Sequence, residues 1–310
     1  MKPSLQIEIA GLTFKNPVMV ASGTFGYGEE FESLIDLDAL GGIVTKSITL
    51  KERAGHPPPR TCETAAGMLN AIGLANVGVE RFIDEKLPFL RKLDTRILVN
   101  VAGSSVAEYV EVCRRLDKAG GFDLIELNIS CPNVDEGGLE FGTDPATVIG
   151  VLRAVRGVCR HPIVAKLSPN VTSIVAIARA AKEGGAAAVS LINTLVGMAI
   201  DSESWTPRLS NITGGLSGPA IKPVAVAMVY KVARAVDLPI IGIGGIATWA
   251  DAVEFHLAGA AGLQVGTANF VDPDTTMSII EGLTRYLSTR KLASLHDLIG
   301  KVRVNHERSQ

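Results

Sequence analysis

The sequence predicts an α/β protein with the fold of a (β/α)8 TIM barrel, and three observations support that fold class. Eight short apolar runs alternate with stretches of helical period along the chain. These runs are hydrophobic nearly throughout, which is typical of strands covered on both faces in a parallel sheet. No linker or shift in composition divides the 310 residues. We therefore expect a single domain over residues 1–310, with an open doubly wound sheet as the alternative.

Each expected strand is short and is bounded by turn residues. The strands are expected at Val18–Ala21, Gly41–Ser47, Arg96–Ala102, Asp123–Ser130, Pro162–Ser168, Ala187–Asn193, Pro239–Gly245 and Gly262–Thr267. Amphipathic periodicity predicts helices at Glu29–Leu37, Val79–Leu93, Val106–Ala119, Ala146–Arg160, Ser173–Glu183, Ala220–Ala235, Trp249–Leu257 and Thr275–Leu287. A turn centred on Gly11 predicts an N-terminal β-hairpin before the barrel.

Two connections are too long to be simple turns. One spans Ile48–Gly78 after the second strand, and the other spans Thr194–Gly218 after the sixth. In a barrel, the loops that follow the strands emerge at the C-terminal face, where active sites are built. We therefore expect both long loops to cover the mouth of the barrel.

Charge and hydropathy argue against nucleic-acid binding, a targeting peptide and a membrane span. With 30 basic and 32 acidic residues and no concentrated basic stripe, the chain is not expected to bind nucleic acid. The N-terminus carries Glu8 and polar breaks, which are atypical of signal and transit peptides. The longest uncharged runs are shorter than the roughly 20 residues that span a bilayer. We expect a cytoplasmic protein with no membrane segment.

The four cysteines lie far apart, with no CxxC pair and no adjacent histidine, so no metal site is predicted. Cys113 and Cys159 fall in helical patterns and are expected to be packed side chains. Cys131 instead follows the fourth strand in a polar loop. Spacing alone leaves it open whether Cys131 is structural or acts as a nucleophile or general base, and the scattered histidines argue against a Cys-His hydrolase.

Five polar residues fall at or near the carboxyl ends of five different predicted strands. They are Lys46, Asn100, Asn128, Lys166 and Asn193. A buried lysine or asparagine loses hydration and needs a partner. Any one of them could simply satisfy a neighbouring backbone group, but five at corresponding strand ends predict a site for a polar ligand.

Glycine-rich segments end the last two strands, at residues 241–247 (IGIGGIA) and 265–268 (VGTA). Backbone amides at such strand-to-helix turns bind phosphate, and the loops after strands seven and eight are a common phosphate site in barrels. Tight packing is the alternative reason for these glycines. Gly242, Gly244 and Ala247 also match the dinucleotide pattern GxGxxA, which we reject because no suitable acidic residue follows about twenty positions later.

Several motifs in the same order resemble those of the class 1 dihydroorotate dehydrogenases, and most closely the class 1B catalytic subunit. The resemblance covers nearly the whole chain. The motifs are NPVMVASGTFGYG (16–28), VTKSITL (44–50), GMLNAIGLANVG (67–78), ELNISCPN (126–133), AKLSPN (165–170), IGIGGI and VGTA. One departure is His56, where the family usually has asparagine between glycine and proline, so the local geometry of the first long loop is in doubt.

The resemblance implies one FMN across the barrel mouth, with its phosphate on the two glycine loops. It also implies that Lys166 lies near the pyrimidine side of the flavin, where a cation stabilises the reduced form. The implied cofactor-binding residues are Ser22, Lys46, Ser47, Asn100, Asn128, Lys166, Ile192, Gly218, Gly244, Gly245, Gly266 and Thr267.

The resemblance further implies oxidation of dihydroorotate to orotate in pyrimidine biosynthesis. Cys131 would remove the C5 proton as general base while a hydride passes from C6 to flavin N5, and its loop would close over the substrate. Asn133 is a weaker substrate contact, since a turn-forming role explains it equally well. The implied substrate-binding residues are Lys46, Asn70, Ala71, Ile72, Gly73, Leu74, Asn128, Asn133, Asn193 and Thr194.

The family also implies a partner subunit that carries FAD and a [2Fe–2S] cluster and passes electrons to NAD⁺. This chain has neither a convincing Rossmann motif nor cluster-spaced cysteines, so the partner would supply both groups. The expected assembly is a heterotetramer of two catalytic and two electron-transfer chains.

Four alternatives stay open at this point. A dihydropyrimidine dehydrogenase-type flavin subunit would act on uracil or thymine, although Lys46 suits a carboxylate better than a neutral base. A class 1A enzyme would use fumarate. An aldolase or isomerase would use Lys166 as a Schiff-base lysine. A binding protein without catalysis would not need five polar strand ends.

Overall fold

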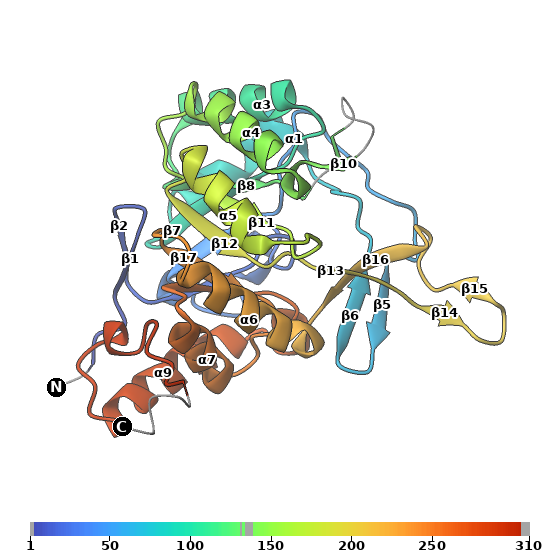
Figure 1. Cartoon of the computed structure of the whole chain (residues 1–310). Helices are drawn as coiled ribbons and strands as arrows, with labels where there is room; N and C mark the ends of the chain where they lie inside the picture. Colours follow the sequence, from blue (N-terminus) through green and yellow to red (C-terminus); the bar gives the residue numbers. More distant parts are fainter. Residues whose placement is uncertain (1–2, 131, 134–138, 305–310) are drawn as a thin grey trace.

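The computed structural model describes residues 3–130, 132–133 and 139–304. Its centre is a closed barrel of parallel strands surrounded by helices (Figure 1). Because the last strand pairs with the first, the open sheet is excluded and the predicted barrel is confirmed. Around the barrel the strands are β3 (Val18–Val20), β4 (Gly42–Val44), β7 (Arg96–Val101), β8 (Leu124–Asn128), β11 (Ile163–Leu167), β12 (Ala188–Leu191), β17 (Ile240–Ile243) and β18 (Gly262–Val265).

The helices follow the predicted alternation with the strands. Ser105, Asp144, Ser173 and Thr248 each begin a helix by accepting a hydrogen bond from a backbone N–H in its first turn. A π-helical turn, η3 (Phe82–Lys86), joins the first two helices. The α-helices are α1 (Gly78–Arg81), α2 (Leu87–Leu90), α3 (Val106–Ala119), α4 (Pro145–Arg156), α5 (Ile174–Glu183), α6 (Lys222–Ala233), α7 (Trp249–Ala258), α8 (Ala268–Val271) and α9 (Thr275–Thr289).

Two local predictions are wrong. The segment Glu29–Leu37 forms no α-helix but two 3₁₀ turns, η1 (Glu29–Phe31) and η2 (Leu37–Ala39). Asp36 accepts a hydrogen bond from the N–H of Asp38 and so starts the second turn, because a short acidic side chain competes for local backbone donors. Cys159 lies beyond the end of α4 rather than within it, although it is buried as expected. The other 3₁₀ turns are η5 (Phe141–Thr143), η6 (Pro219–Ile221) and η7 (Leu295–Asp297).

The predicted N-terminal hairpin is confirmed as β1 (Ile7–Ile9) and β2 (Leu12–Phe14). Ala10 and Gly11 both have positive φ, which suits a two-residue turn between antiparallel strands. Ile9 is fully buried, and a Cβ built on Gly262, the first residue of β18, would lie 2.7 Å from its Cδ1 atom. The hairpin therefore packs against the N-terminal end of the barrel.

The two long connections form a second sheet instead of irregular loops. Its strand order is β13–β16–β6–β5, so strands from both connections pair with each other. The smaller pair β14 and β15 extends from it, away from the barrel, at the right of Figure 1. The bounds are β5 (Thr61–Thr64), β6 (Gly67–Asn70), β13 (Leu195–Met198), β14 (Ile200–Asp201), β15 (Thr206–Pro207) and β16 (Thr213–Ser217), and a further short pair is β9 (Pro132–Asn133) with β10 (Leu139–Glu140).

Within the described ranges, none of the helices is both long enough and apolar enough to cross a bilayer. The longest, α9, has 15 residues.

Candidate active site

A cavity of about 1240 Å³ opens at the carboxyl ends of the barrel strands. Every barrel strand except β7 contributes lining residues, either from the strand or from the segment just after it. The other side of the cavity is lined by β5, β6 and β16 of the second sheet. Since a pocket for one small ligand usually measures about 300–1,000 Å³, this cavity has room for a cofactor and a substrate together.

Most of the residues predicted for the site line this cavity. Asn100 does not: it is fully buried and outside the lining. Cys131 lies outside the described residues, as does the side chain of Asn133. The predicted residues that line the cavity are Ser22, Lys46, Ser47, Asn70, Ala71, Ile72, Gly73, Leu74, Asn128, Lys166, Ile192, Asn193, Thr194, Gly218, Gly244, Gly245, Gly266 and Thr267.

Lys46 supplies a cation to the cavity wall. Burial lowers the pKa of its ammonium group, the nearby Arg60 guanidinium lowers it further, and Glu30 opposes both effects. A partly desolvated ammonium beside a second cation is stabilised in its charged form when an anion binds. Lys46 is therefore suited to hold a carboxylate.

Asparagine side chains give the cavity a fixed set of donors and acceptors. The Oδ1 atom of Asn128 accepts hydrogen bonds from Asn193 Nδ2, at 3.3 Å, and from the N–H of Ser130, also at 3.3 Å. Asn193 Oδ1 in turn accepts from the N–H of Thr194 at 2.8 Å. Asn70 Nδ2 donates to the Gly215 carbonyl at 3.2 Å, which ties the two long connections together. These contacts orient the amides toward a ligand that both donates and accepts hydrogen bonds.

The glycine-rich segment 241–247 approaches Gly218 closely at the edge of the cavity. Gly245 has a φ of +73°, and a Cβ there would lie 2.8 Å from the Gly218 carbonyl oxygen, so no side chain fits. The N–H groups of Ala247 and Thr248, at the start of α7, already donate to the Asp251 carboxylate. Any phosphate contact on this side therefore depends on Gly244 and Gly245 rather than on the capped end of α7.

A buried carboxylate lies among the barrel strands next to the cavity. Glu126 of β8 has no exposed surface, and its Oε1 atom accepts a hydrogen bond from Asn100 Nδ2 at 2.7 Å. Its Oε2 atom accepts from Ser190 Oγ at 2.8 Å and from Gln264 Nε2 at 2.6 Å. The Nζ atom of Lys166, a cavity-lining residue, is 3.7 Å from Oε1. Residues from five strands thus form one polar cluster.

Sequence reasoning missed Glu126, Gln264 and Arg60. The signal for Glu126 was available, because an acidic residue in the apolar strand sequence LIELN is as unusual as the lysines and asparagines that we singled out. Arg60 could not be found in this way, since it lies in a connection without strand periodicity.

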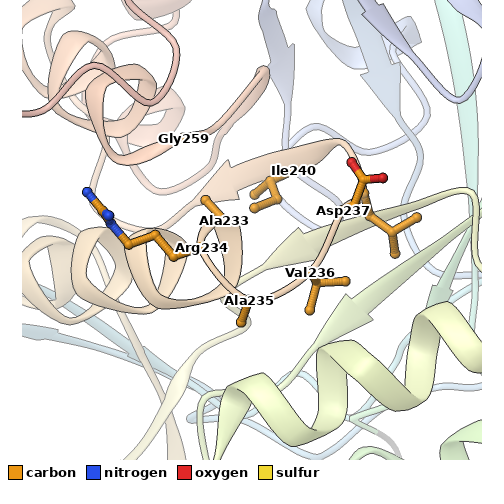
Figure 2. Close-up of a pocket in the computed structure, with 8 residues that line it drawn as sticks. Ala233, Arg234, Ala235, Val236, Asp237, Ile240 and Gly259 are labelled. Carbon is orange, nitrogen blue, oxygen red and sulfur yellow. The ribbon is translucent and has the colours of Figure 1, made fainter.

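A second, smaller hollow of about 420 Å³ lies at the other end of the barrel, between the C-terminus of α6 and the start of β17 (Figure 2). The side chains of Arg234 and Asp237 extend away from each other there, and Arg234 stacks over the ring of Tyr230. None of the residues predicted for the site lines this hollow. The large cavity is thus the candidate active site.

Asp117, Cys159 and His161 bring potential metal ligands within 4.8 Å of one another. Burial alone would raise the pKa of Asp117, but hydrogen bonds from the Arg160 N–H, from His161 and from the Arg160 side chain lower it to about 2. Burial raises the pKa of the Cys159 thiol to about 11. We interpret the cluster as an ion pair that joins α3 to the segment before β11, because its carboxylate is already occupied by cationic and N–H donors.

Comparison with known proteins finds close relatives over nearly the whole chain. A family model described as dihydroorotate dehydrogenase matches residues 4–287. A protein of Geobacter sulfurreducens named "Dihydroorotate dehydrogenase B (NAD(+)), catalytic subunit" is 54% identical over 98% of this chain and 99% of its own length. A protein of Alkaliphilus oremlandii with the same name is 55% identical over 96% of this chain and 99% of its own length.

Proposed function

Because this chain belongs to the dihydroorotate dehydrogenase family, we propose that it oxidises dihydroorotate to orotate, a step of pyrimidine biosynthesis, as an FMN-containing, NAD⁺-linked catalytic subunit. The relatives also confirm the resemblance to class 1B catalytic subunits that the motifs predicted. The observation that carries the proposal is the position of Lys46, a desolvated cation in a cavity that glycine-rich segments also line. The region around Lys46 suits a carboxylate, and the glycine-rich segments suit a phosphate.

Three features of the cavity fit FMN. Its volume of about 1240 Å³ exceeds what one small ligand needs. Gly218, Gly244 and Gly245 line the cavity with bare backbone, because a Cβ at any of them would lie within 3.0 Å of other protein atoms. Asn128 and Lys166, at the ends of adjacent strands, line the cavity and offer an amide and an ammonium group to the isoalloxazine ring. When bound, FMN supplies a hydride acceptor.

The chain's own residues would hold FMN at both ends. Gly244 and Gly245, together with Gly266 and Thr267, would contact the phosphate. Lys166 would lie at the ring, where its positive charge stabilises the reduced form. We propose the same role in cofactor binding for the remaining residues, Ser22, Lys46, Ser47, Asn100, Asn128, Ile192 and Gly218.

Dihydroorotate would bind between Lys46 and the asparagines. Lys46 would meet its carboxylate, while Asn128 and Asn193, which are hydrogen-bonded to each other, would contact the cyclic ureide. The loop segment Asn70–Leu74, with Thr194, would line the other side of the ring. Asn133 stays a weaker prediction, since its side chain is outside the described residues.

We propose Cys131 as the general base that removes the C5 proton, although it lies outside the described residues. It follows directly on Asn128 and Ser130, which line the cavity, and this position in the sequence supports the proposal. A thiol has a reference pKa of about 8.5, so part of it is ionised near neutral pH, and a nearby cation increases that fraction.

We propose that electrons leave this subunit for a partner that carries FAD and a [2Fe–2S] cluster and reduces NAD⁺. The names of the relatives support the existence of a partner, because these proteins are called catalytic subunits of an NAD⁺-linked enzyme. The partner's cofactors, the heterotetramer of two plus two chains and a cytoplasmic location stay proposals. Co-expression with a candidate partner, followed by measurement of the native mass and iron content, would test the assembly.

The decisive experiment is anaerobic addition of dihydroorotate to the purified chain. We expect the flavin absorption band to bleach. Once saturated with FMN, the Lys46→Gln variant should require far more dihydroorotate for the same bleaching. If dihydrouracil bleaches the flavin and dihydroorotate does not, the dihydropyrimidine dehydrogenase alternative is correct instead.

The electron acceptor separates this enzyme from the fumarate-linked class 1A alternative. After reduction, addition of fumarate to the isolated chain should leave the flavin reduced, whereas the reconstituted complex should pass the electrons to NAD⁺. Rapid reoxidation by fumarate alone would contradict the class 1B assignment of this chain's activity.

A further inference from the structure

The polar cluster around Glu126 is unusual for the interior of a barrel, which is normally filled by layers of branched apolar side chains. Three side chains donate hydrogen bonds to the Glu126 carboxylate: Asn100 at 2.7 Å, Ser190 at 2.8 Å and Gln264 at 2.6 Å. All four residues are fully buried. A carboxylate that is so enclosed is costly to bury unless it also has a cationic partner.

Lys166 is that partner. Its Nζ atom lies 3.7 Å from Glu126 Oε1, and the side chains of the two residues are 7% and 0% exposed. Register places Lys166 directly beside Asn128 on β8, two residues beyond Glu126. The lysine lines the cavity and the glutamate does not. A ligand in the cavity therefore contacts the cation, while the compensating negative charge lies behind it.

The hydrogen bonds also determine how two amides are oriented. A carboxylate only accepts hydrogen bonds, so the amide nitrogens of Asn100 and Gln264 must face Glu126. Their oxygens then point elsewhere, and both Asn100 Oδ1 and Gln264 Oε1 are buried without a hydrogen-bond partner among the described residues. Glu126 therefore determines that the unpaired acceptors next to it are the amide oxygens of Asn100 and Gln264.

We propose that Glu126 is a positioning residue that acts as the buried counter-ion of Lys166 and so sets the net charge beneath the flavin. The inference rests on the proposed binding of FMN in the cavity. With both charges present the pair is neutral. With Glu126 neutralised, Lys166 is an uncompensated cation, and with Lys166 neutralised, Glu126 is an uncompensated anion.

The consequence is an ordered set of flavin potentials. Reduction places negative charge on the flavin, so a lone cation nearby favours the reduced form and a lone anion opposes it. Glu126→Gln should raise the midpoint potential above that of the wild type. Lys166→Gln should lower it. The double variant, which lacks both charges, should have a potential between those of the two single variants.

The test is an anaerobic redox titration of FMN in these four proteins, with a reference dye. The ratio of the affinity for reduced FMN to the affinity for oxidised FMN should be higher in Glu126→Gln than in the wild type. We expect an increase of about tenfold or more. Ser190→Ala is the matched control, because it removes one hydrogen bond to Glu126 but neither charge. Its potential should stay close to that of the wild type.

Two results would overturn the proposal: a potential of Glu126→Gln at or below that of the wild type, or a double variant whose potential lies outside the range between the two single variants. Should a variant lose FMN, thermal unfolding of the four apoproteins decides instead. Each single variant leaves one buried charge unpaired and should unfold at a lower temperature than the double variant. A double variant no more stable than the weaker single variant contradicts the ion pair. A wild-type chain that takes up no FMN contradicts the proposed function, and the unfolding order then still tests the pair.

Discussion

The two ends of the barrel differ in how their polar side chains are paired. At the N-terminal end, the hairpin packs Ile9 and Phe14 into the core, and the Asp117 carboxylate is fully occupied by Arg160 and His161. At the C-terminal end, Lys46 lines the cavity and is desolvated beside another cation, Arg60.

The difference separates groups that hold the fold together from groups kept ready for ligands. A buried polar group without a partner costs stability, and such cost is expected where a ligand supplies the missing contact. Substitutions of cavity-lining residues outside the Glu126–Lys166 pair should therefore change chemistry and binding with little effect on unfolding. Substitutions at the N-terminal end should do the reverse.

The largest expected effect is on the rate at which dihydroorotate reduces the flavin. Cys131→Ala removes the proposed base and should slow this step by about 10²–10⁴-fold, with FMN retained and the unfolding temperature little changed. Stopped-flow absorbance under anaerobic conditions measures it. Cys62→Ser is the control, since Cys62 lies on β5 and does not line the cavity. A normal rate in Cys131→Ala would remove the cysteine from the mechanism.

At the opposite end, Phe14→Ala should lower the free energy of unfolding by about 3–5 kcal/mol, because it empties a fully buried site under the barrel. Urea unfolding measures the loss. Glu8→Ala is the control on the adjoining strand, since Glu8 is exposed between two buried isoleucines. The flavin reduction rate of the folded Phe14→Ala variant should equal that of the wild type, and a slower rate would show that the two ends are coupled.

His256, on α7, makes the stability of the N-terminal end depend on pH. Burial lowers the pKa of its imidazole from 6.5 to about 4, against the hydrogen bond between Nδ1 and the Ala260 carbonyl. The unfolded chain therefore binds an extra proton between these values. The contribution of neutral His256 to the free energy of unfolding is therefore fully present above pH 6.5 and is lost as the pH falls through about 4. The total change is about 3 kcal/mol.

Urea unfolding at about pH 7 and about pH 5 measures this dependence. The His256→Asn variant keeps a side-chain N–H near the position of Nδ1 but does not titrate, so its stability should change less between the two pH values. An equal change in both proteins would assign the acid sensitivity to other groups.

The smallest expected effect concerns substrate affinity. Lys46→Gln should weaken the binding of orotate by about 10- to 100-fold, the value of one hydrogen bond to a charged group. In the wild type, affinity should also fall as the pH rises through the lowered pKa of Lys46, because the neutral amine no longer attracts the carboxylate. Titration of orotate against the flavin spectrum over a range of pH measures both. The exposed Lys51→Gln should behave as the wild type, and an unchanged pH profile in Lys46→Gln would exclude Lys46 as the titrating group.

The barrel could be predicted because its strands and helices repeat a local pattern. A run such as Ile163–Leu167 is apolar along its whole length, which already indicates a strand covered on both faces. The site followed from the same rule, since the carboxyl ends of parallel strands meet at one edge, and Lys46, Asn128 and Lys166 line one cavity there. The helical pattern failed as a predictor at Asp36, because its side chain accepts a hydrogen bond from a backbone N–H and so starts a separate turn.

Local sequence patterns were therefore sufficient to predict the repeating strand–helix units, the hairpin and the rim on which most polar site residues lie. Only the tertiary structure decided that Asn70 pairs with Gly215 across 145 residues, so that two long connections form one sheet over the mouth. It alone decided that Glu126 meets Asn100, Ser190, Gln264 and Lys166 inside the barrel. The physical reason is that periodicity depends on neighbours along the chain, whereas the charge and hydrogen bonding of a buried group depend on residues that closure of the barrel brings together.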